Sequence, residues 1–352
     1  MEGSKQKHFL IVGAGLAGQS VAIHLLRAGQ KVSVVDNGVN HSSIIAAGMV
    51  NPLVFRRMTK SWRVDEFTPY LKEFYQSIEN ICGKPVFRPI TIRRMFSNEH
   101  ERELWLDKQE REEFQSYMEK VTQEDIDFNK VINNFGSGRV KNAGWVNTDV
   151  FLNECKNIIR KDGEIIELQF EYKDLDHLTY QGEEYSDIIF CEGYMGKYNP
   201  WFGHLPLNQT KGDTLDIRSK QIPENESVNR KCFVLPLGEN RFKVGSTYQW
   251  HTSDPTPNEE GKNAILEKLS FLIDEEFEIL DHSAGVRPTT YDRRPLIGSH
   301  PEHPNYHIFN GLGTKGYMLA PLLAKEFCDY LLLEKPLHKE VNISRVKAKD
   351  NS

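Results

Sequence analysis

The feature that most constrains this chain is a complete strand–turn–helix–strand unit at its N-terminal end. A β-prone run at residues 8–12 leads into the turn Gly13-Ala14-Gly15-Leu16-Ala17-Gly18. Apolar residues then recur at helical spacing up to Gly29, and a second β-prone run at residues 31–35 ends in Asp36. We therefore expect an α/β fold of the Rossmann type to grow from this unit.

The three glycines of the turn each meet a separate steric demand of dinucleotide binding. Gly13 allows a sharp turn from strand to helix, Gly15 lets the backbone approach a pyrophosphate, and Gly18 lets helix and strand pack closely. The helix N-terminus offers unpaired N–H groups to the phosphates, and Asp36 is placed to accept hydrogen bonds from a ribose. The unit predicts a dinucleotide site but does not choose between NAD and FAD. The alternative is a glycine-rich turn with no ligand.

Composition excludes several classes of protein. The 352 residues include 50 acidic and 44 basic side chains, so the formal charge of −6 gives no general attraction to nucleic acid. The five cysteines are scattered and form no C-x-x-C pair, which argues against a disulfide scaffold and a thiolate metal site. No apolar run approaches the roughly 18 residues that cross a bilayer. We expect a cytoplasmic protein without a metal.

A second glycine-rich turn lies near the other end of the chain. The β-prone run at residues 306–309 is followed by the glycine-rich segment 310–316 and then by a predicted helix at 317–333. Another strand of buried type, residues 187–191, runs into Gly193. Two such turns at opposite ends predict one nucleotide-binding domain that is assembled from separated segments.

Between these segments the composition and the predicted secondary structure change. Residues 66–81 predict a helix, residues 99–120 are acidic and helical in composition, and residues 231–248 predict a β-hairpin. The acidic region and the hairpin are expected to form a second domain. The polar ends, residues 1–7 and 339–352, are expected to be mobile.

Five further segments occur in an order that is shared with one known family. They are residues 43–52, residues 187–193, Gly245-Ser246-Thr247, Gly285-Val286-Arg287-Pro288 with Asp292 and Pro295-Leu296-Ile297-Gly298, and residues 311–321. In this order they resemble the FAD-dependent D-amino-acid oxidase superfamily, which includes glycine oxidase and sarcosine oxidase. The resemblance implies FAD rather than NAD, and a substrate domain of antiparallel strands over the flavin.

The resemblance also implies a division of the chain and a set of cofactor contacts. Residues 1–85, 140–210 and 285–352 are expected to form the FAD-binding domain, and residues 86–139 and 211–284 the substrate-binding domain. The residues expected to contact FAD come from the glycine turns, the flavin loop and the ends of the strands: Gly13, Gly15, Leu16, Ala17, Gly18, Asp36, Asn37, Ser43, Ala47, Gly48, Met49, Gly193, Gly311, Gly313, Thr314, Lys315 and Gly316.

The sequence departs from the family pattern at two points. Members with covalent flavin carry a cysteine shortly before the aspartate of the signature, where this chain has Gly285-Val286-Arg287-Pro288. We therefore predict that FAD is bound non-covalently. The closing loop reads Gly-Leu-Gly-Thr-Lys-Gly, without the histidine common in glycine oxidases. It is closer to the FAD domain of the bacterial tRNA wobble-uridine modification enzyme, which has arginine at the position of Lys315.

Three side chains are predicted to act on a substrate. The family places a carboxylate-binding guanidinium at Arg287, and a bidentate pair suits an amino-acid substrate. Tyr248 is expected to wall the pocket, with Trp250 as a second candidate. Lys315 is expected to face the edge of the flavin that gains negative charge on reduction. The alternative for Arg287 is a structural ion pair. For Tyr248 and Trp250 it is core packing, and for Lys315 it is a solvated lysine on a loop.

A basic cluster just after the flavin loop is not explained by the family pattern. It consists of Arg56, Arg57, Lys60 and Arg63 around Trp62. It is expected to be a solvated or ion-paired surface, and the alternative is steering of an acidic substrate or a nucleic-acid phosphate.

Three functions remain open at this stage. The first is a FAD-dependent oxidase or dehydrogenase that converts a small amino acid or secondary amine to an imine by hydride transfer. The second is a tRNA-modifying flavoenzyme that removes a carboxymethyl group from a wobble uridine, which is the one reading that involves nucleic acid. The third is a non-catalytic flavin-binding protein. The substrate, its enantiomer, the electron acceptor and the oligomeric state stay open.

Overall fold

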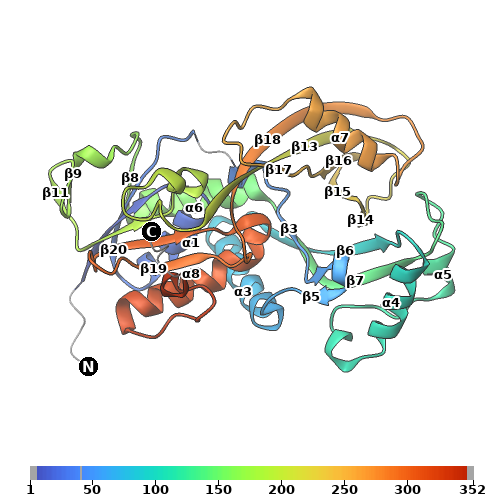
Figure 1. Cartoon of the computed structure of the whole chain (residues 1–352), viewed down its shortest axis with the longest axis horizontal. Coiled ribbons are helices and arrows are strands. Elements are labelled where there is room, and N and C mark those ends of the chain that lie inside the picture. Colours follow the sequence, from blue (N-terminus) through green and yellow to red (C-terminus); the bar gives the residue numbers. More distant parts are fainter. Residues whose placement is uncertain (1–5, 40–41, 347–352) are drawn as a thin grey trace, which may run out of the picture.

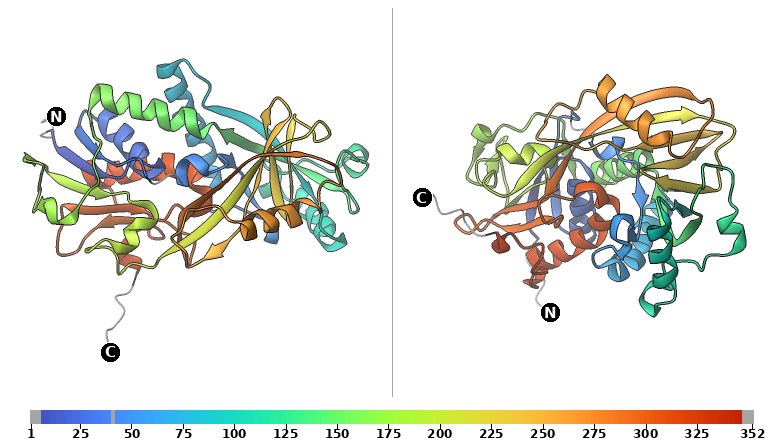
Figure 2. Two further views of the ribbon diagram at one scale, coloured as in Figure 1. Left: turned by 90° about the horizontal axis from the view of Figure 1, so that it is seen from above. Right: turned by 45° about the vertical axis from the view of Figure 1, so that its right-hand side comes forward.

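Two β-sheets of different character form the molecule. In the computed structural model, which describes residues 6–39 and 42–346, one sheet lies with the long helices at one end of the molecule and the other lies at the opposite end (Figure 1). The long strands β13 (Leu207–Arg218) and β18 (Glu278–Thr290) run as an antiparallel pair from the middle of the molecule into the second sheet (Figures 1 and 2).

The first sheet, sheet A, is mainly parallel and six-stranded. Its strands in spatial order are β19 (Leu296–Ser299), β20 (Tyr306–Asn310), β12 (Asp187–Phe190), β1 (His8–Val12), β2 (Lys31–Val35) and β8 (Glu164–Ile166). Phe9, Leu10 and Ile11 of β1 are fully buried because both faces of the sheet are covered: Phe9 and Ile11 pack into one core cluster, and Leu10 packs into another on the opposite face. The sheet confirms that a Rossmann-type layer is built from segments that lie far apart in the sequence.

Long helices cover sheet A. They are α1 (Leu16–Arg27), α3 (Val64–Cys82), α6 (Thr148–Asp162) and α8 (Gly316–Leu333). Helix α1 packs against both α8 and α6, and α3 packs against α8. The apolar face of α3 that the sequence predicted is fully buried at Phe67, Leu71 and Ile78.

The second sheet, sheet B, has nine strands and is mostly antiparallel and curled. In spatial order it contains β17 (Gln249–Trp250), β13, β16 (Arg241–Gly245), β15 (Cys232–Gly238), β14 (Glu226–Arg230), β6 (Phe87–Met95), β7 (Ser137–Val146) and β3 (Met49–Val50), with β18 paired to β13. The predicted hairpin is β15 and β16. Glu239 and Asn240 at its tip both have positive φ, which suits a two-residue turn between twisted strands.

Short elements complete the fold. They are α2 (Ser42–Ile45), α4 (Glu99–Gln109), α5 (Gln123–Ile126), α7 (Glu259–Leu269), β4 (Leu53–Val54), β5 (Thr59–Lys60), β9 (Leu175–Asp176), β10 (Thr179–Tyr180) and β11 (Glu183–Glu184). Within the described ranges, no helix is both long enough and apolar enough to cross a membrane.

Two sequence-based expectations hold only in part. The helical composition of residues 99–120 leads to a helix over only part of the region, because α4 ends at Gln109 and only a 3-10 turn at Glu112–Phe114 follows. Phe114, Tyr117 and Met118 are buried, and Met118 bridges to Val140 of β7 instead of continuing a helix. Tertiary burial of these apolar side chains overrides the helical composition.

The C-terminal segment is also better ordered than its polarity suggested. Val341 is fully buried and accepts a backbone hydrogen bond from Ile297, 2.9 Å long. Arg345 donates to Asp292 across 3.1 Å, so residues 339–346 form part of the fold. Lys7, at the other end, pairs with Asp187 at 3.2 Å. The remainder of both predicted mobile ends, residues 1–5 and 347–352, lies outside the described residues.

The two-domain division stays a prediction. All six strands of sheet A fall within the segments assigned to the FAD-binding domain. Three assigned boundaries, however, fall inside strands β7, β13 and β18, and β3 joins sheet B from the N-terminal segment. Continuous strands therefore cross between the two assigned regions.

Candidate active site

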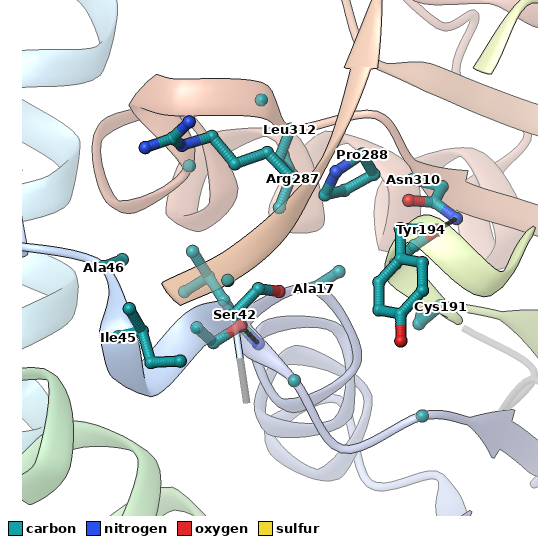
Figure 3. Close-up of a pocket in the computed structure, with 18 of the residues that line it drawn as sticks. Ala17, Ser42, Ile45, Ala46, Cys191, Tyr194, Arg287, Pro288, Asn310 and Leu312 are labelled. Carbon is teal, nitrogen blue, oxygen red and sulfur yellow. Dashed lines mark hydrogen bonds between the residues drawn. The ribbon is translucent and has the colours of Figure 1, made fainter. Parts of the chain in front are cut away.

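One cavity joins the glycine turns of sheet A to a face of sheet B. It has a volume of about 640 Å³ and extends from Gly13 and Asp36 to Phe233 and Arg287. Figure 3 shows Ala17, Ser42, Cys191 and Arg287 around part of this space. Its wall contains all the predicted site residues except Gly18 and Gly311. The chain therefore brings its separated glycine-rich segments to one space.

The first turn is shaped by close backbone contacts. Gly13 has φ +103°, and a Cβ there would lie 2.6 Å from the carbonyl oxygen of Cys191. A Cβ on Gly18 would lie 1.9 Å from the carbonyl oxygen of Gly13, so Gly18 allows helix α1 to pack on the turn and does not face the cavity. No other side chain fits at these two positions.

The N-terminus of α1 is open to an anion. Gly15 caps the helix without a side-chain hydrogen bond, and the first turn holds no acidic residue. The N–H groups of Ala17 and Gly18 have no acceptor among the residues described. Free N–H groups and the positive end of the helix dipole suit a pyrophosphate.

Asp36 is held in the loop that follows β2. Its carboxylate accepts hydrogen bonds from the N–H groups of Ala14 and Gly38, each 2.6 Å long. The neighbouring Asn37 donates to Gln169, and both line the cavity. The remaining lone pairs of Asp36 are available to ribose hydroxyls.

The predicted flavin loop is tied to both glycine turns. The hydroxyl of Ser43 accepts a 3.0 Å hydrogen bond from the N–H of Leu16, and the carbonyl of Ser43 accepts one of 2.8 Å from the hydroxyl of Tyr317 on α8. A Cβ on Gly48 would lie 2.0 Å from the carbonyl oxygen of Val146, so only glycine fits there. Gly48 thereby lets Met49 pair with β7 and still line the cavity.

The closing turn is braced from the side of β12. Asn310 donates to the carbonyl of Gly193 at 2.9 Å and accepts from the N–H of Gly311 at 2.8 Å. Gly311 has φ +76° and lies behind the cavity wall, whereas Gly313 and Thr314 line it.

The ammonium group of Lys315 is bound by the loop that follows the flavin loop. It donates to the carbonyls of Asn51 and Leu53, at 2.9 and 3.2 Å, and to the hydroxyl of Ser61. No carboxylate of the described chain forms an ion pair with it. Burial, with a smaller contribution from Arg293, lowers the pKa of Lys315 to about 7. Lys315 lines the cavity, but its Nζ serves as a brace for residues 51–61.

Arg287 is a cation at the cavity wall without an acidic partner. No carboxylate of the described residues lies within ion-pair distance of its guanidinium, which donates only to the carbonyl of Thr247 at 3.3 Å. Burial lowers the pKa of Arg287 from its ordinary value. Tyr248 lies with its ring 5.0 Å from the guanidinium carbon and is half exposed, whereas Trp250 does not line the cavity. An unpaired guanidinium here suits an incoming carboxylate.

A glycine on the neighbouring strand makes room for this guanidinium. A Cβ on Gly212 of β13 would lie 1.9 Å from Nη2 and 2.1 Å from Nη1 of Arg287. Asp213 next to it is fully buried and accepts a 2.8 Å hydrogen bond from the hydroxyl of Thr247. Asp213 thereby fixes the loop whose carbonyl receives Arg287. The sequence carried no signal for Gly212 or Asp213, because their partners lie far away along the chain.

Several cavity residues were not predicted. Asn229 and Phe233 reach the cavity from β14 and β15. Glu192 lines the wall beside the first turn, where Tyr172 and Asn199 donate to its carboxylate. Burial raises the pKa of Glu192 above its ordinary value. The one sequence signal that could have identified Glu192 as a cavity residue is its position directly before Gly193.

Two cations of the basic cluster are paired within the chain and two are exposed, which agrees with the expected solvated or ion-paired surface. Arg63 binds Glu66 and Glu326, and Lys60 binds Asp65. Arg56 and Arg57 are exposed. Among the described residues, no group of three or more His, Cys, Asp or Glu side chains is arranged to hold a metal ion.

The chain was compared with known proteins. The family model described as FAD dependent oxidoreductase (DAO) matches residues 8–330. A glycine oxidase of Bacillus subtilis (strain 168) is 21% identical over 366 aligned residues, which cover 96% of this chain and 95% of that protein.

Two further matches bear on fold and function. The tRNA 5-methylaminomethyl-2-thiouridine biosynthesis bifunctional protein MnmC of Legionella pneumophila (strain Philadelphia 1) is 24% identical over 242 residues, or 58% of this chain and 34% of that protein. The crystal structure of glycine oxidase from Geobacillus kaustophilus superimposes with a TM-score of 0.81 at 17% identity, covering 99% of this chain and all of that one.

Proposed function

This chain belongs to the FAD-dependent oxidoreductase (DAO) family and is an enzyme of that kind, and from this premise we propose that it oxidises the C–N bond of a small amino acid or secondary amine. The product is an imine, which water then hydrolyses. The observation that carries the proposal is the half-buried guanidinium of Arg287, which lines the cavity without an acidic partner among the described residues.

The cavity fits FAD by its shape and its donors. Glycines at positions 13 and 48 keep the wall clear of side chains, and the free N–H group of Ala17 suits the pyrophosphate. Asp36 suits a ribose, and Met49 with the loop at 313–316 suits the flavin ring. When bound, FAD supplies the two-electron acceptor that amino-acid side chains lack.

Non-covalent binding is part of the proposal. Cys191 is the one cysteine of the described chain that lines the cavity. Burial raises the pKa of its thiol well above the ordinary value, so the nucleophilic thiolate is disfavoured. Cys82, Cys155, Cys232 and Cys328 lie elsewhere.

We assign the residues of the chain to binding and orientation. Arg287 binds the substrate carboxylate, the ring of Tyr248 packs on the guanidinium, and Asp213 holds the loop that receives Arg287. The amine then reacts in its neutral form: a hydride leaves the α-carbon, the nitrogen lone pair forms the C=N bond, and a proton is lost from nitrogen. This sequence of bonds needs no side-chain base at the moment of hydride loss.

An anaerobic screen tests the proposal. FAD-loaded protein is mixed with α-amino acids and N-alkylamino acids while the visible flavin absorbance is followed. Bleaching by at least one compound, with release of a carbonyl product, is expected. In the Arg287→Met variant the same compound should bleach the flavin only at concentrations about 100-fold higher, because a charge-assisted pair is lost. Loaded protein that no such compound bleaches contradicts the proposal.

A tRNA-modifying activity is the second candidate, and the partial match to MnmC supports it. The match covers 58% of this chain and 34% of that bifunctional protein, so it extends over only part of each. The basic cluster adds little support, because Lys60 and Arg63 are already paired with carboxylates. Of the four cations, Arg56 and Arg57 remain for contacts with phosphates. Binding of tRNA that weakens steeply with added salt favours this candidate, and its absence removes it.

A further inference from the structure

Asn229 lines the cavity from strand β14. Strands β15 and β16 separate β14 from β13, the strand next to Arg287. Asn229 occupies one row across the sheet with Phe233 of β15, Gly245 of β16 and Thr214 of β13, which are cross-strand partners in turn. A Cβ on Gly245 would lie 3.0 Å from both Phe233 and Thr214, so these side chains share one face. Phe233, Thr214 and Asn229 all line the cavity. The open space therefore follows this row of the sheet.

The orientation of the Asn229 carboxamide is fixed by Arg94. The guanidinium of Arg94 lies 2.7 Å from Oδ1 of Asn229, and it is itself bound by Glu101 at 2.7 Å and nearly buried. A guanidinium carries donors and no acceptor, so the amide oxygen must face Arg94 and the NH₂ group must face away from it. Within the described chain, that NH₂ group has no hydrogen-bond acceptor. A fixed, unused donor thus lies at the cavity wall.

The separation between this donor and Arg287 sets the length of a ligand that reaches both. Thr214 and Asn229 are three strand spacings apart, about 14 Å in a flat sheet and less in a curled one. The guanidinium of Arg287 lies over Gly212, two residues from Thr214 on the same strand. The two residues along the strand add about 7 Å, so the two polar groups are about 16 Å apart in a flat sheet and closer in a curled one. Each end is reached through a hydrogen bond of about 2.9 Å, so a ligand that bridges them must itself span on the order of 10 Å. Glycine is far too short.

We propose that Asn229 is a second recognition point for the substrate. It selects amino acids or secondary amines with an acceptor oxygen (carboxylate, carbonyl or amide) on a substituent several bonds from the α-carboxylate. Phe233 forms the apolar floor between the two polar ends. The inference rests on the proposed function of Arg287 and extends it from a class of reaction to a class of substrate.

Binding of simple acids to the FAD-loaded protein tests the proposal without turnover. Unbranched α,ω-dicarboxylates from succinate to suberate are compared with monocarboxylates of equal carbon number, and the shift of the visible flavin band reports binding. We expect the longer dicarboxylates to bind at least tenfold more tightly than their monocarboxylate counterparts. Asn229→Leu, which keeps the volume, should abolish that preference and change monocarboxylate affinity less than twofold.

Two variants separate the possible failures. Asn208→Leu alters a carboxamide on β13 that does not line the cavity, and should keep the preference. Arg287→Met should weaken both series together. A preference that survives Asn229→Leu, or a wild type without any preference, overturns the second recognition point. Affinities that are unchanged in Arg287→Met overturn the proposed function instead.

Discussion

The substitution Gly212→Ala tests how the chain positions its substrate-binding cation. The new methyl group would start 1.9–2.2 Å from three atoms of the Arg287 guanidinium. Non-bonded carbon and nitrogen atoms need about 3.5 Å, so the guanidinium must move by more than about 1 Å. Because it is the far end of a flexible side chain, the strand itself can stay in place, and Gly212→Ala should fold normally.

The displacement should cost most of the carboxylate affinity. Two charge-assisted hydrogen bonds together contribute about 3 kcal/mol or more, which corresponds to a loss of at least about 100-fold in kcat/KM and in the affinity for a simple carboxylate. Titration of the flavin absorbance with acetate measures the affinity, and thermal unfolding with the FAD content of the purified protein measures the integrity of the fold.

A double-mutant cycle provides the control. If both substitutions act through the guanidinium, Gly212→Ala combined with Arg287→Met should be no worse than Arg287→Met alone. An unchanged carboxylate affinity in Gly212→Ala, or additive losses in the double variant, would refute the steric reasoning.

Three further predictions follow from the site. Gly18→Ala should yield protein without FAD or none that folds, since its Cβ would lie 1.9 Å from a backbone oxygen; a normally loaded variant, by absorbance ratio, contradicts the packing. FAD should be released in full by acid precipitation, so yellow colour retained in the washed pellet argues for a covalent bond. Burial lowers the pKa of Lys315 to about 7, whereas the pKa of an unfolded lysine is about 10.4. Between these two pH values the folded state binds fewer protons than the unfolded state, so the free energy of unfolding rises with pH. In Lys315→Met the slope of the free energy of unfolding against pH should fall by up to about 1.4 kcal/mol per pH unit, measured by urea unfolding between pH 7.5 and 9.5. Equal slopes for the wild type and the variant would count against a buried neutral amine at Lys315.

The sequence by itself determined the nucleotide-binding layer. Its signals are local: the turn at residues 13–18, the strands on either side and the acid at position 36 lie within one short segment. Strands this close in sequence pair and pack with their own helix, so spacing alone was informative. The hairpin of β15 and β16 was predictable for the same reason.

The tertiary structure decided where the polar side chains act. The position of Lys315 at the flavin edge stays a prediction, and the structure adds that three oxygens from residues 51–61 bind its ammonium group. Helical composition over 99–120 gave way to the burial of Phe114, Tyr117 and Met118. Gly212 meets Arg287, and Asn229 meets Arg94, across strands that are far apart in the chain. Such contacts depend on strand register, which short-range patterns do not encode.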